Sequence, residues 1–573
     1  MTDFPSRRQN PAIPCNLALG AIIIVLLAVA ARAVLQFSTP LAPGMNGAYY
    51  FVQARSLLEH GKLGIPDLPL TFWVHASLSR IFQGVTGWDQ ARSIVIAVKA
   101  TDSVLPPLAA LPLIWLGWNW QRNGDAPSMM AALAPALAAV LGAQALRMTG
   151  DFQKNSLGLI WLAALAPAAH SFLTQPSARR ALLPLVLIGL LGITHVGVLG
   201  GALVFIGVLA AISSVSAPPT VRMQVLLFTL AGIVVMGCAG AITRTFDPNR
   251  FHRLTQAIVS PTNFAESQGG PGMAGNRPPR PQGQDFAPNQ QPPFAPAGTD
   301  HPPRPGPGHP PDGHGFIGPP FAPGWGFITL GILGLVVSLW KRRHLPAADF
   351  ALALAAGITC GLLGEPFMDE QKAERLMLIA VIPAAITVSF LLAQLSWPWL
   401  RHGLGVVIIG LTLISAQDYV RNGGRAILTT EAQAELRALS TLIPVPERTL
   451  IVARHGLEWW TAWTLHTHIA QPGAISTEDW QRYDQVLFLS ENRVSDPLRD
   501  PAGYMRQAGH PLHAPQLAGR SPGGFPGGPG EAEVPMDART LHAGKYYQLS
   551  LVPEPPENTP TDAEIAAHRL NRP

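Results

Sequence analysis

The feature that most constrains this chain is a series of apolar runs, each close to the ~20 residues that a helix needs to cross a bilayer. Such runs recur along the whole sequence, for example at 17–37, 223–242 and 376–395. Hydrophobic residues make up 48% of the chain and charged residues only 13%, a composition that excludes a soluble globular protein. The sequence therefore predicts a polytopic α-helical membrane protein.

The predicted spans lie at 17–37, 93–118, 127–147, 156–174, 181–213, 223–243, 324–340, 346–364, 375–393 and 403–418. The run 181–213 is too long for one upright crossing and short for two, and the segment GITHVG interrupts it around His195. Either two shortened crossings meet at His195, or one tilted helix crosses and 69–82 becomes a span. We prefer the two crossings, because Arg80 would otherwise lie within a span, at a cost of at least ~2.5 kcal/mol near the bilayer centre. About 10 to 11 transmembrane helices are expected.

Positive charges divide the loops between the two faces of the membrane. Arginines precede the first span, so the tail 1–16 is expected in the cytoplasm, together with Arg222 and the basic segment 341–344. Both arrangements of the spans place 244–323 and 419–573 on the opposite face, the periplasmic side of a bacterial inner membrane. Arginines at span ends account for much of the net charge of +5, so no nucleic-acid partner is expected.

Composition separates the membrane part from two polar regions. A membrane module, 17–243, is followed by a Pro/Gly-rich loop, 244–323, which cannot bury enough apolar surface to fold and is expected to be disordered. The three histidines of this loop fit a solvated linker better than a metal site. Further membrane helices occupy 324–418. The three cysteines lie in or beside apolar segments and predict neither a disulfide nor a metal site.

The region 419–573 reads as a folded domain. TLIVA, QVLFLS and KYYQLSLV are typical of strands, and EAQAELRALSTLI and LEWWTAWTLHTHIA of helices. These segments predict a C-terminal periplasmic α/β domain, interrupted by a second Pro/Gly-rich insertion. His455, Glu458, His466 and His468 resemble a metal motif, but histidines two residues apart point away from each other on a helix. A core stripe through Trp459, Trp463 and His466, or a sugar-stacking face, is the preferred interpretation.

Two short amphipathic helices are predicted between the first two spans. In the first, at about 48–60, Tyr50, Phe51, Ala54, Leu57 and Leu58 form one apolar stripe, Asn46 stands at or before the N-cap, and Gly61 ends the helix. The second, at about 68–83, carries tryptophan at interfacial depth. Both are expected to lie flat on the outer membrane face and to cover a chamber open to lipid.

This arrangement resembles the GT-C superfamily of membrane glycosyltransferases over roughly residues 17–220. The resemblance rests on a first span, a Tyr-containing amphipathic helix that ends in Leu-Leu-x-x-Gly, and a Pro-Leu-x-x-Trp helix. It implies a polyprenyl-phosphate-linked sugar donor, transfer at the outer membrane face and an essential acid in the first outer loop. That acid stands in a D-x-x-Y pattern, whereas this chain has Asn46-Gly47-Ala48-Tyr49. Asn46 and Tyr49 are therefore predicted to contact substrate, but an amide cannot act as the base.

Other carboxylates are candidates for the missing base. Asp67 is the nearest aspartate, with an N-cap role as the alternative. Asp151 lies in the second outer loop, where the superfamily often has an acid that helps to bind metal or donor phosphate; an ion pair with Lys154 is the alternative. Arg375, at the start of a span, is predicted to grip a phosphodiester or to anchor a lipid headgroup. His195 is predicted to contact substrate or to bond a backbone carbonyl freed at the break.

The leading functional hypothesis is a GT-C-like glycosyltransferase that moves a sugar from a polyprenyl-phosphate carrier to a periplasmic glycan, lipid or protein. Asp67 or Asp151 would activate the acceptor hydroxyl, and Arg375, Lys154 or a divalent cation, Mg²⁺ or Mn²⁺, would neutralise the departing phosphate. Asn46 in the acid position favours an alternative, a non-catalytic scaffold or glycan-binding protein of cell-envelope assembly. A transporter is the third possibility, but the spans hold few charges, and Lys99 and Asp102 are expected to pair at i, i+3.

Overall fold

The computed structural model describes residues 14–122, 127–216, 219–248, 251–252, 255, 323–364, 370–471, 475, 477–492 and 538–553. Most of the predicted tail 1–16, of the loop 244–323 and of the second Pro/Gly-rich insertion lies outside these residues. The predicted disorder of the long loop and the linker role of its histidines therefore stay predictions.

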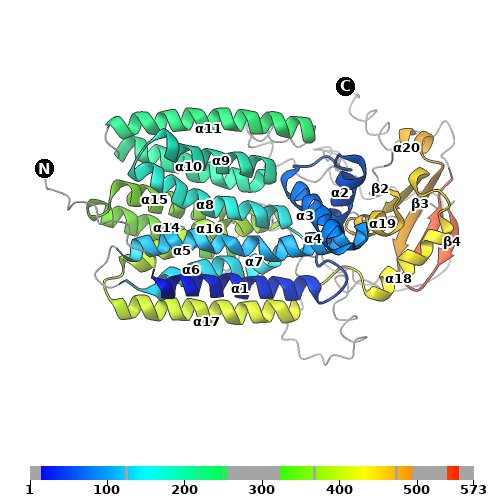
Figure 1. The fold of residues 1–573 in the computed structure, drawn as a ribbon, viewed down its shortest axis with the longest axis horizontal. Helices are drawn as coiled ribbons and strands as arrows, with labels where there is room; N and C mark the ends of the chain where they lie inside the picture. Colours follow the sequence, from blue (N-terminus) through cyan, green and yellow to red (C-terminus); the bar gives the residue numbers. More distant parts are fainter. Residues whose placement is uncertain are drawn as a thin grey trace, which may run out of the picture.

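A bundle of nearly parallel helices forms the larger part of the molecule (Figure 1). Its helices are α1 (Cys15–Phe37), α4 (Gln90–Val104), η1 (Pro106–Ala109), α5 (Ala110–Gln121), α6 (Met129–Leu141), α7 (Ala143–Arg147), α8 (Gln153–Thr174), α9 (Ala178–Thr194), α10 (Val196–Ser216), α11 (Pro219–Phe246), α14 (Pro323–Lys341), α15 (Ala347–Leu363), α16 (Glu370–Gln394) and α17 (Pro398–Asn422). In the described part of the chain, nine helical segments are long and apolar enough to cross a membrane. Helices α9 and α15, of 17 residues each, are shorter and pack among them. This confirms the predicted fold class.

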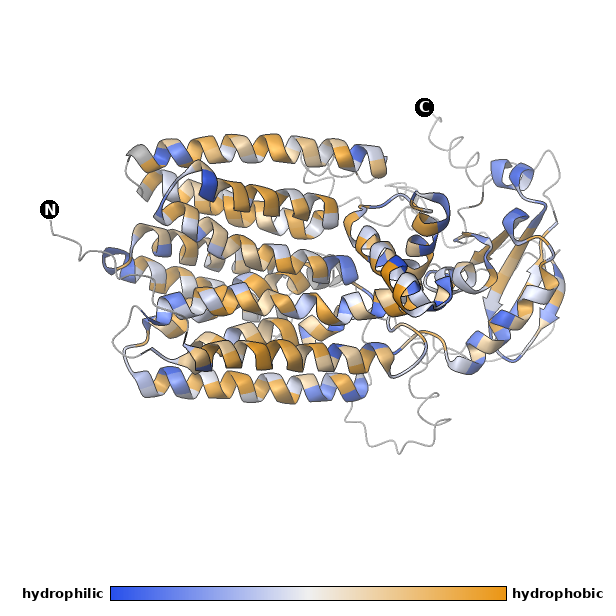
Figure 2. Ribbon diagram, viewed as in Figure 1, coloured by the Kyte–Doolittle hydropathy of each residue, from blue (hydrophilic) through white to orange (hydrophobic). Residues whose placement is uncertain are grey.

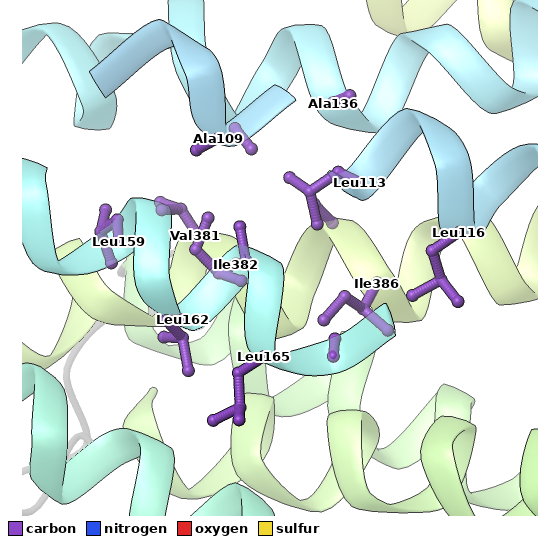
Figure 3. Packing of buried hydrophobic residues seen from close by; sticks show 14 of the residues in the cluster. Ala109, Leu113, Leu116, Ala136, Leu159, Leu162, Leu165, Val381, Ile382 and Ile386 are labelled. Atoms are coloured by element: carbon purple, nitrogen blue, oxygen red, sulfur yellow. The ribbon is translucent and has the colours of Figure 1, made fainter. Parts of the chain in front are cut away.

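Leucine, isoleucine and alanine fill the centre of the bundle. Figure 3 shows Leu113 and Leu116 of α5, Leu162 of α8 and Ile382 and Ile386 of α16 packed against one another. Figure 2 shows the same property from outside, because apolar residues cover the helices and hydrophilic residues gather at the bundle ends and on the C-terminal domain. Polar pairs are also buried among these helices, such as Asp349 with His170 at 2.7 Å.

Helices α9 and α10 are two separate antiparallel helices, which agrees with the preferred arrangement of the spans. His195 separates them in an extended conformation, with φ −160° and ψ 119°. Helix α8 begins beside Asp67, and Phe246 at the end of α11 packs against Trp73 with ring centroids 6.2 Å apart. The start of α8 and the end of α11 therefore lie at the same end of the bundle. An even number of crossings must join them, which requires α9 and α10 to cross separately.

Two further helices, α2 (Gly47–His60) and α3 (Leu70–Thr86), lie at one end of the bundle, between it and a sheet (Figure 1). We call this the α2/α3 end. Their bounds follow the amphipathic patterns in the sequence. Gly61 ends α2 in the left-handed conformation at φ 70°, as expected for a glycine C-cap.

The C-terminal domain is a five-stranded mixed sheet with flanking helices. Its elements are α18 (Thr430–Ala438), β1 (Thr449–Ala453), α19 (Leu457–Leu465), β2 (His468–Ala470), α20 (Thr477–Arg482), β3 (Gln485–Glu491), β4 (Arg539–Ala543) and β5 (Tyr547–Leu551). The strand order is β2-β1-β3-β5-β4, with β1 parallel to β2 and β3 and the remaining pairs antiparallel. The predicted α/β domain and its strands are confirmed. The helix predicted through Ala470 is too long, because His466 adopts φ 60° and β2 follows.

The C-terminal domain is docked on α2 through aromatic rings. Phe51 of α2 lies 6.1 Å from Trp460 and 5.3 Å from Trp463, and Tyr49 lies 4.8 Å from Trp459, measured between ring centroids. Arg55 of α2 donates to the carbonyl oxygens of Ala462 at 2.7 Å and Trp463 at 3.1 Å. These carbonyls belong to the last turn of α19, where the helix itself has no further N–H group to donate to them. Arg55 therefore caps α19 from the membrane part of the chain.

We expect Arg55→Met to loosen this docking. The substitution keeps an apolar side chain but removes hydrogen bonds from a charged donor, each worth roughly 1.5–3 kcal/mol. Amide hydrogen exchange should then rise in α19 and β1 by at least about tenfold, since 1.4 kcal/mol corresponds to a factor of ten. Arg92→Met is the matched control, because Arg92 stacks on Trp88 at 4.6 Å and is exposed. Unchanged exchange in Arg55→Met would show that the aromatic contacts alone hold the domain.

Candidate functional site

Two loops meet at the α2/α3 end, and glycine lets them approach. Gly44 and Gly150 both have φ +81°, a conformation that L side chains rarely adopt. A Cβ on Gly44 would lie 2.6 Å from the Cβ of Asp151, and one on Gly150 would lie 2.3 Å from the carbonyl oxygen of Pro43. The backbones of the first and second loops are therefore in direct contact, which brings Asp151 beside Asn46.

Gly150→Ala should displace the second loop. Positive φ costs alanine roughly 1–2 kcal/mol, and the clash with Pro43 adds to this. Gly61→Ala is the matched control, because Gly61 also has positive φ but no atom lies within 4 Å of its would-be Cβ. The melting temperature should fall clearly further in Gly150→Ala than in Gly61→Ala. Equal losses would mean that the two loops are not in firm contact.

Asp151 is the centre of the site. Its carboxylate accepts hydrogen bonds from the backbone N–H of Asn46 at 2.8 Å and from the Asn46 side-chain amide at 2.7 Å. The hydroxyl of Tyr50 donates to the backbone carbonyl of Asp151 at 3.2 Å. Burial raises the pKa of Asp151, and the Asn46 hydrogen bonds and the positive charges of His455 and Arg375 oppose that rise without cancelling it. Four segments far apart in sequence thus meet at one carboxylate.

Asn46 does not cap α2 with its side chain, which is committed to Asp151. The residue in the position of the expected acid therefore orients a carboxylate that the second loop supplies. This gives Asn46 a structural reason for being an amide. An aspartate there could not donate, and two carboxylates would face each other.

Asp67 and Lys154 form a second group beside the first. Asp67 is 1% exposed, forms an ion pair with Lys154 and accepts hydrogen bonds from the hydroxyl of Tyr49 and from the backbone N–H of Leu68. Tyr50 lies near both groups, because the charges of Asp151 and Asp67 both act on its hydroxyl. The predicted Asp151–Lys154 ion pair is wrong, because Lys154 pairs with Asp67. The N-cap alternative for Asp67 is also wrong, because Pro69 occupies the N-cap of α3.

Arg375 and His195 occupy different surroundings. Arg375 lies near the start of α16 with an exposed side chain, and its charge acts on Asp151. His195 accepts a hydrogen bond from the backbone N–H of Val198 at 3.2 Å and so caps α10. The structure brings Arg375, Asn46 and Asp151 together. It gives His195 a capping role at the break between two helices.

Sequence reasoning considered His455 only as part of a possible metal motif and missed its place beside Asp151. It follows β1, and the next residue, Gly456, has φ +95° and lies against Met45, with a would-be Cβ 3.5 Å from the Met45 carbonyl oxygen. This contact places His455 beside the loop that carries Asn46. A usable signal exists in the sequence, since residues that follow parallel strands gather at one edge of a sheet. No group of three or more His, Cys, Asp or Glu in the described residues is arranged to hold a metal ion.

The predicted pairing of Lys99 with Asp102 is wrong. Lys99 donates to the carbonyl oxygens of three successive residues, Thr39, Pro40 and Leu41, at 2.8, 3.1 and 3.0 Å. Asp102 instead pairs with Arg32 at 2.7 Å and accepts from the backbone N–H of Gly150 at 2.8 Å. Both charges are buried and hold the two loops in place. They are supports of the site and not a path for ions.

The predicted chamber beneath α2 and α3 stays a prediction. Two small cavities in the described part of the chain each have a volume of about 10 Å³, room for about one water. One lies among Leu162, Phe205 and Ile382, the other beside Arg32 and Ser156, and neither is lined by α2 or α3. Tyr50 and Phe51 of α2 and Phe72 of α3 are buried. The amphipathic stripe correctly identified a buried face but not the α19 aromatics that cover it.

Comparison with solved structures identifies the fold. No protein-family model and no curated protein matches this chain. It is similar to the oligosaccharyltransferase AglB from Archaeoglobus fulgidus, in complex with an inhibitory peptide and a dolichol-phosphate, with 11% identity over 83% of this chain and 70% of that one and a TM-score of 0.50. Similarity to ArnT from Cupriavidus metallidurans bound to undecaprenyl phosphate has a TM-score of 0.48 at 11% identity, over 94% of this chain and 97% of that one. The predicted GT-C resemblance is confirmed at the level of fold.

Proposed function

We propose that this chain, which has the GT-C fold, is a membrane glycosyltransferase that moves a sugar from a polyprenyl-phosphate carrier to an acceptor. The reaction would take place at the α2/α3 end, facing the periplasm of a bacterial inner membrane, and the C-terminal domain would lie on the same side. AglB, whose fold this chain shares, was solved with a dolichol-phosphate, which supports a lipid-linked donor.

The observation that carries this proposal is the environment of Asp151. Asn46 holds its carboxylate, and burial raises its pKa above that of an ordinary aspartate. A carboxylate whose pKa is moved toward neutral pH is a better general base, because it removes a proton more readily while still being ionised. We therefore assign the base to Asp151 and not to Asp67, both of whose oxygens are in hydrogen bonds or an ion pair.

The reaction then follows from these positions. Asp151 accepts the proton of the acceptor hydroxyl while the oxygen of that hydroxyl bonds to the anomeric carbon of the sugar. The bond between that carbon and the phosphate oxygen breaks, and the phosphate keeps the electron pair and gains one negative charge. Arg375 is exposed beside Asp151 and can neutralise this charge through a bidentate contact. Lys154 is less suited to this task, because its charge is already matched by Asp67.

A divalent cation remains an expectation from the resemblance. In the described residues the site offers one carboxylate, Asp151, and the amide oxygen of Asn46, which is fewer oxygen ligands than Mg²⁺ or Mn²⁺ takes. The acids Glu365 and Asp369 lie outside the described residues, as does the side chain of Glu370. The mechanism above therefore assigns no step to a metal.

A transfer assay tests the proposal. The full-length chain in proteoliposomes is supplied with a panel of polyprenyl-phosphate sugars, each labelled in the sugar, and with acceptor membranes from a strain lacking the protein. We expect labelled sugar to move to the acceptor with release of an equal amount of polyprenyl phosphate. No transfer from any donor in the panel would overturn the proposal.

The second candidate is a non-catalytic scaffold or glycan-binding protein. The packing of α19 on α2 favours it, because it covers the apolar face of α2. The transfer assay distinguishes the two candidates. A scaffold binds glycan or donor lipid without turnover, whereas the enzyme releases polyprenyl phosphate.

A further inference from the structure

A pair of ionisable residues from the C-terminal domain lies beside the site. The ring nitrogen Nδ1 of His455 is 2.8 Å from Oε1 of Glu458, one helical turn further along the chain. Glu458 is 1% exposed, and the amide of Gln471 donates to the same oxygen at 3.1 Å. Its other oxygen, Oε2, is buried and has no hydrogen-bond partner. A buried carboxylate in this state is costly unless a positive charge stands next to it, and His455 is placed to provide one.

The backbone positions this pair against Asp151. Gly456 contacts Met45, Met45 precedes Asn46, and Asn46 holds the Asp151 carboxylate. The side chain of His455 is 35% exposed, whereas that of Glu458 is 2% exposed. The docking of α19 on α2, through Phe51 and Arg55, fixes the relative position of the two domains.

From this geometry we infer that His455, held by Glu458, is a positioning residue that supplies a positive charge opposite Asp151, so that the C-terminal domain completes the transfer site. The inference rests on the proposed function. It adds a role for the C-terminal domain, which lies outside the membrane module. Without the imidazolium, burial favours the protonated form of Asp151, which cannot accept a proton. The positive charge of His455 opposes this protonation.

The pKa directions agree with this role. Burial alone lowers the pKa of His455, but the hydrogen bond to Glu458 and the charges of Glu458 and Asp151 outweigh burial and the opposing charge of Arg454, and raise it. Arg454 is itself paired with Glu491. In the described part of the chain, the charges of His455 and Arg375 act on Asp151, the Asp67–Lys154 pair lies nearby, and the charge of Asp151 acts on Tyr50 and Tyr419. Transfer therefore needs a pH above the pKa of Asp151 and below the pKa of His455. The rate of transfer then has a bell-shaped dependence on pH.

The pH dependence of kcat/KM tests the inference. His455→Gln removes the charge that opposes protonation of Asp151, so the acidic limb should move up by about one pH unit and the alkaline limb should disappear. Glu458→Gln lowers the pKa of His455, so the alkaline limb should move to lower pH. His468→Gln is the matched control, because His468 lies on β2 against Tyr483, and its profile should equal that of the wild type. Active variants with unmoved limbs would overturn the inference.

An NMR titration separates this inference from the proposed function. In the full-length chain with labelled histidine, the His455 signal is assigned by its loss in His455→Gln. Its pKa should fall in Glu458→Gln and in Asp151→Asn, and stay unchanged in His468→Gln. If the wild type transfers no sugar but the His455 pKa falls in both variants, the proposed function fails while the pairing holds. If the His455 pKa is unchanged in both variants, the inference fails whatever the activity.

Discussion

Asp151→Asn is expected to lower sugar transfer by about 100-fold or more, the range found when a general base is removed. The amide has the same shape and still occupies the place next to Asn46, so the loop should keep its position. It cannot take a proton from the acceptor hydroxyl. The measurement is the initial rate of transfer from a polyprenyl-phosphate donor in proteoliposomes, normalised to folded protein.

Two variants serve as comparisons for Asp151→Asn. Asp89→Asn removes a charge at the same end of the bundle, but Asp89 is the N-cap of α4 and asparagine caps as well, so the rate should be unchanged. Asp67→Asn should reduce stability more than turnover, because it removes the negative charge of the buried Asp67–Lys154 ion pair. A rate that survives in Asp151→Asn and is lost in Asp67→Asn would move the base to Asp67.

The second large effect concerns the buried ion pair between Arg32 and Asp102. Arg32 is 1% exposed and donates to Asp102, to the carbonyl oxygen of Ala145 at 2.9 Å and to the hydroxyl of Ser156 at 3.2 Å. Removing one partner of such a pair leaves an uncompensated charge and costs about 3–5 kcal/mol. We expect Arg32→Met to lower the free energy of unfolding by this amount, measured by denaturant titration in detergent.

The double variant Arg32→Met/Asp102→Leu should recover part of this loss, because no unpaired charge then remains. Arg448→Met is the control, since its ion pair with Asp484 is exposed and worth about 0–1 kcal/mol. A loss in Arg32→Met no larger than in Arg448→Met would contradict the supporting role of the buried pair.

Sequence patterns predicted the elements well, because these patterns record local geometry. The apolar stripe through Tyr50 and Phe51 marks the buried face of α2, and the interruption at His195 marks the end of one crossing and the start of the next. The strand β1 was recognisable from TLIVA, a fully buried parallel strand.

The partners of charged residues could not be predicted in the same way. Helical spacing paired Lys99 with Asp102 and Asp151 with Lys154, but Asp102 pairs with a residue 70 positions away and Lys154 with one 87 positions away. A buried charge pairs with the residue that the packing of distant helices places beside it. Electrostatic attraction in the buried interior is stronger than between solvent-exposed neighbours. The contribution of His455 was hidden for the same reason, since it depends on how the C-terminal domain docks on α2.

The central claim is that the donor sugar phosphate binds at the α2/α3 end, with Asp151, held by Asn46, as the base for the acceptor and with Arg375 beside the phosphate. Photocrosslinking tests it most directly, using a polyprenyl phosphate with a diazirine next to the phosphate and the full-length chain in nanodiscs. The account predicts crosslinks in the peptides that contain Asn46, Asp151 and Arg375, and their loss when unlabelled polyprenyl phosphate competes. Crosslinks confined to the lipid-facing sides of α11 and α17 and insensitive to competitor would contradict it.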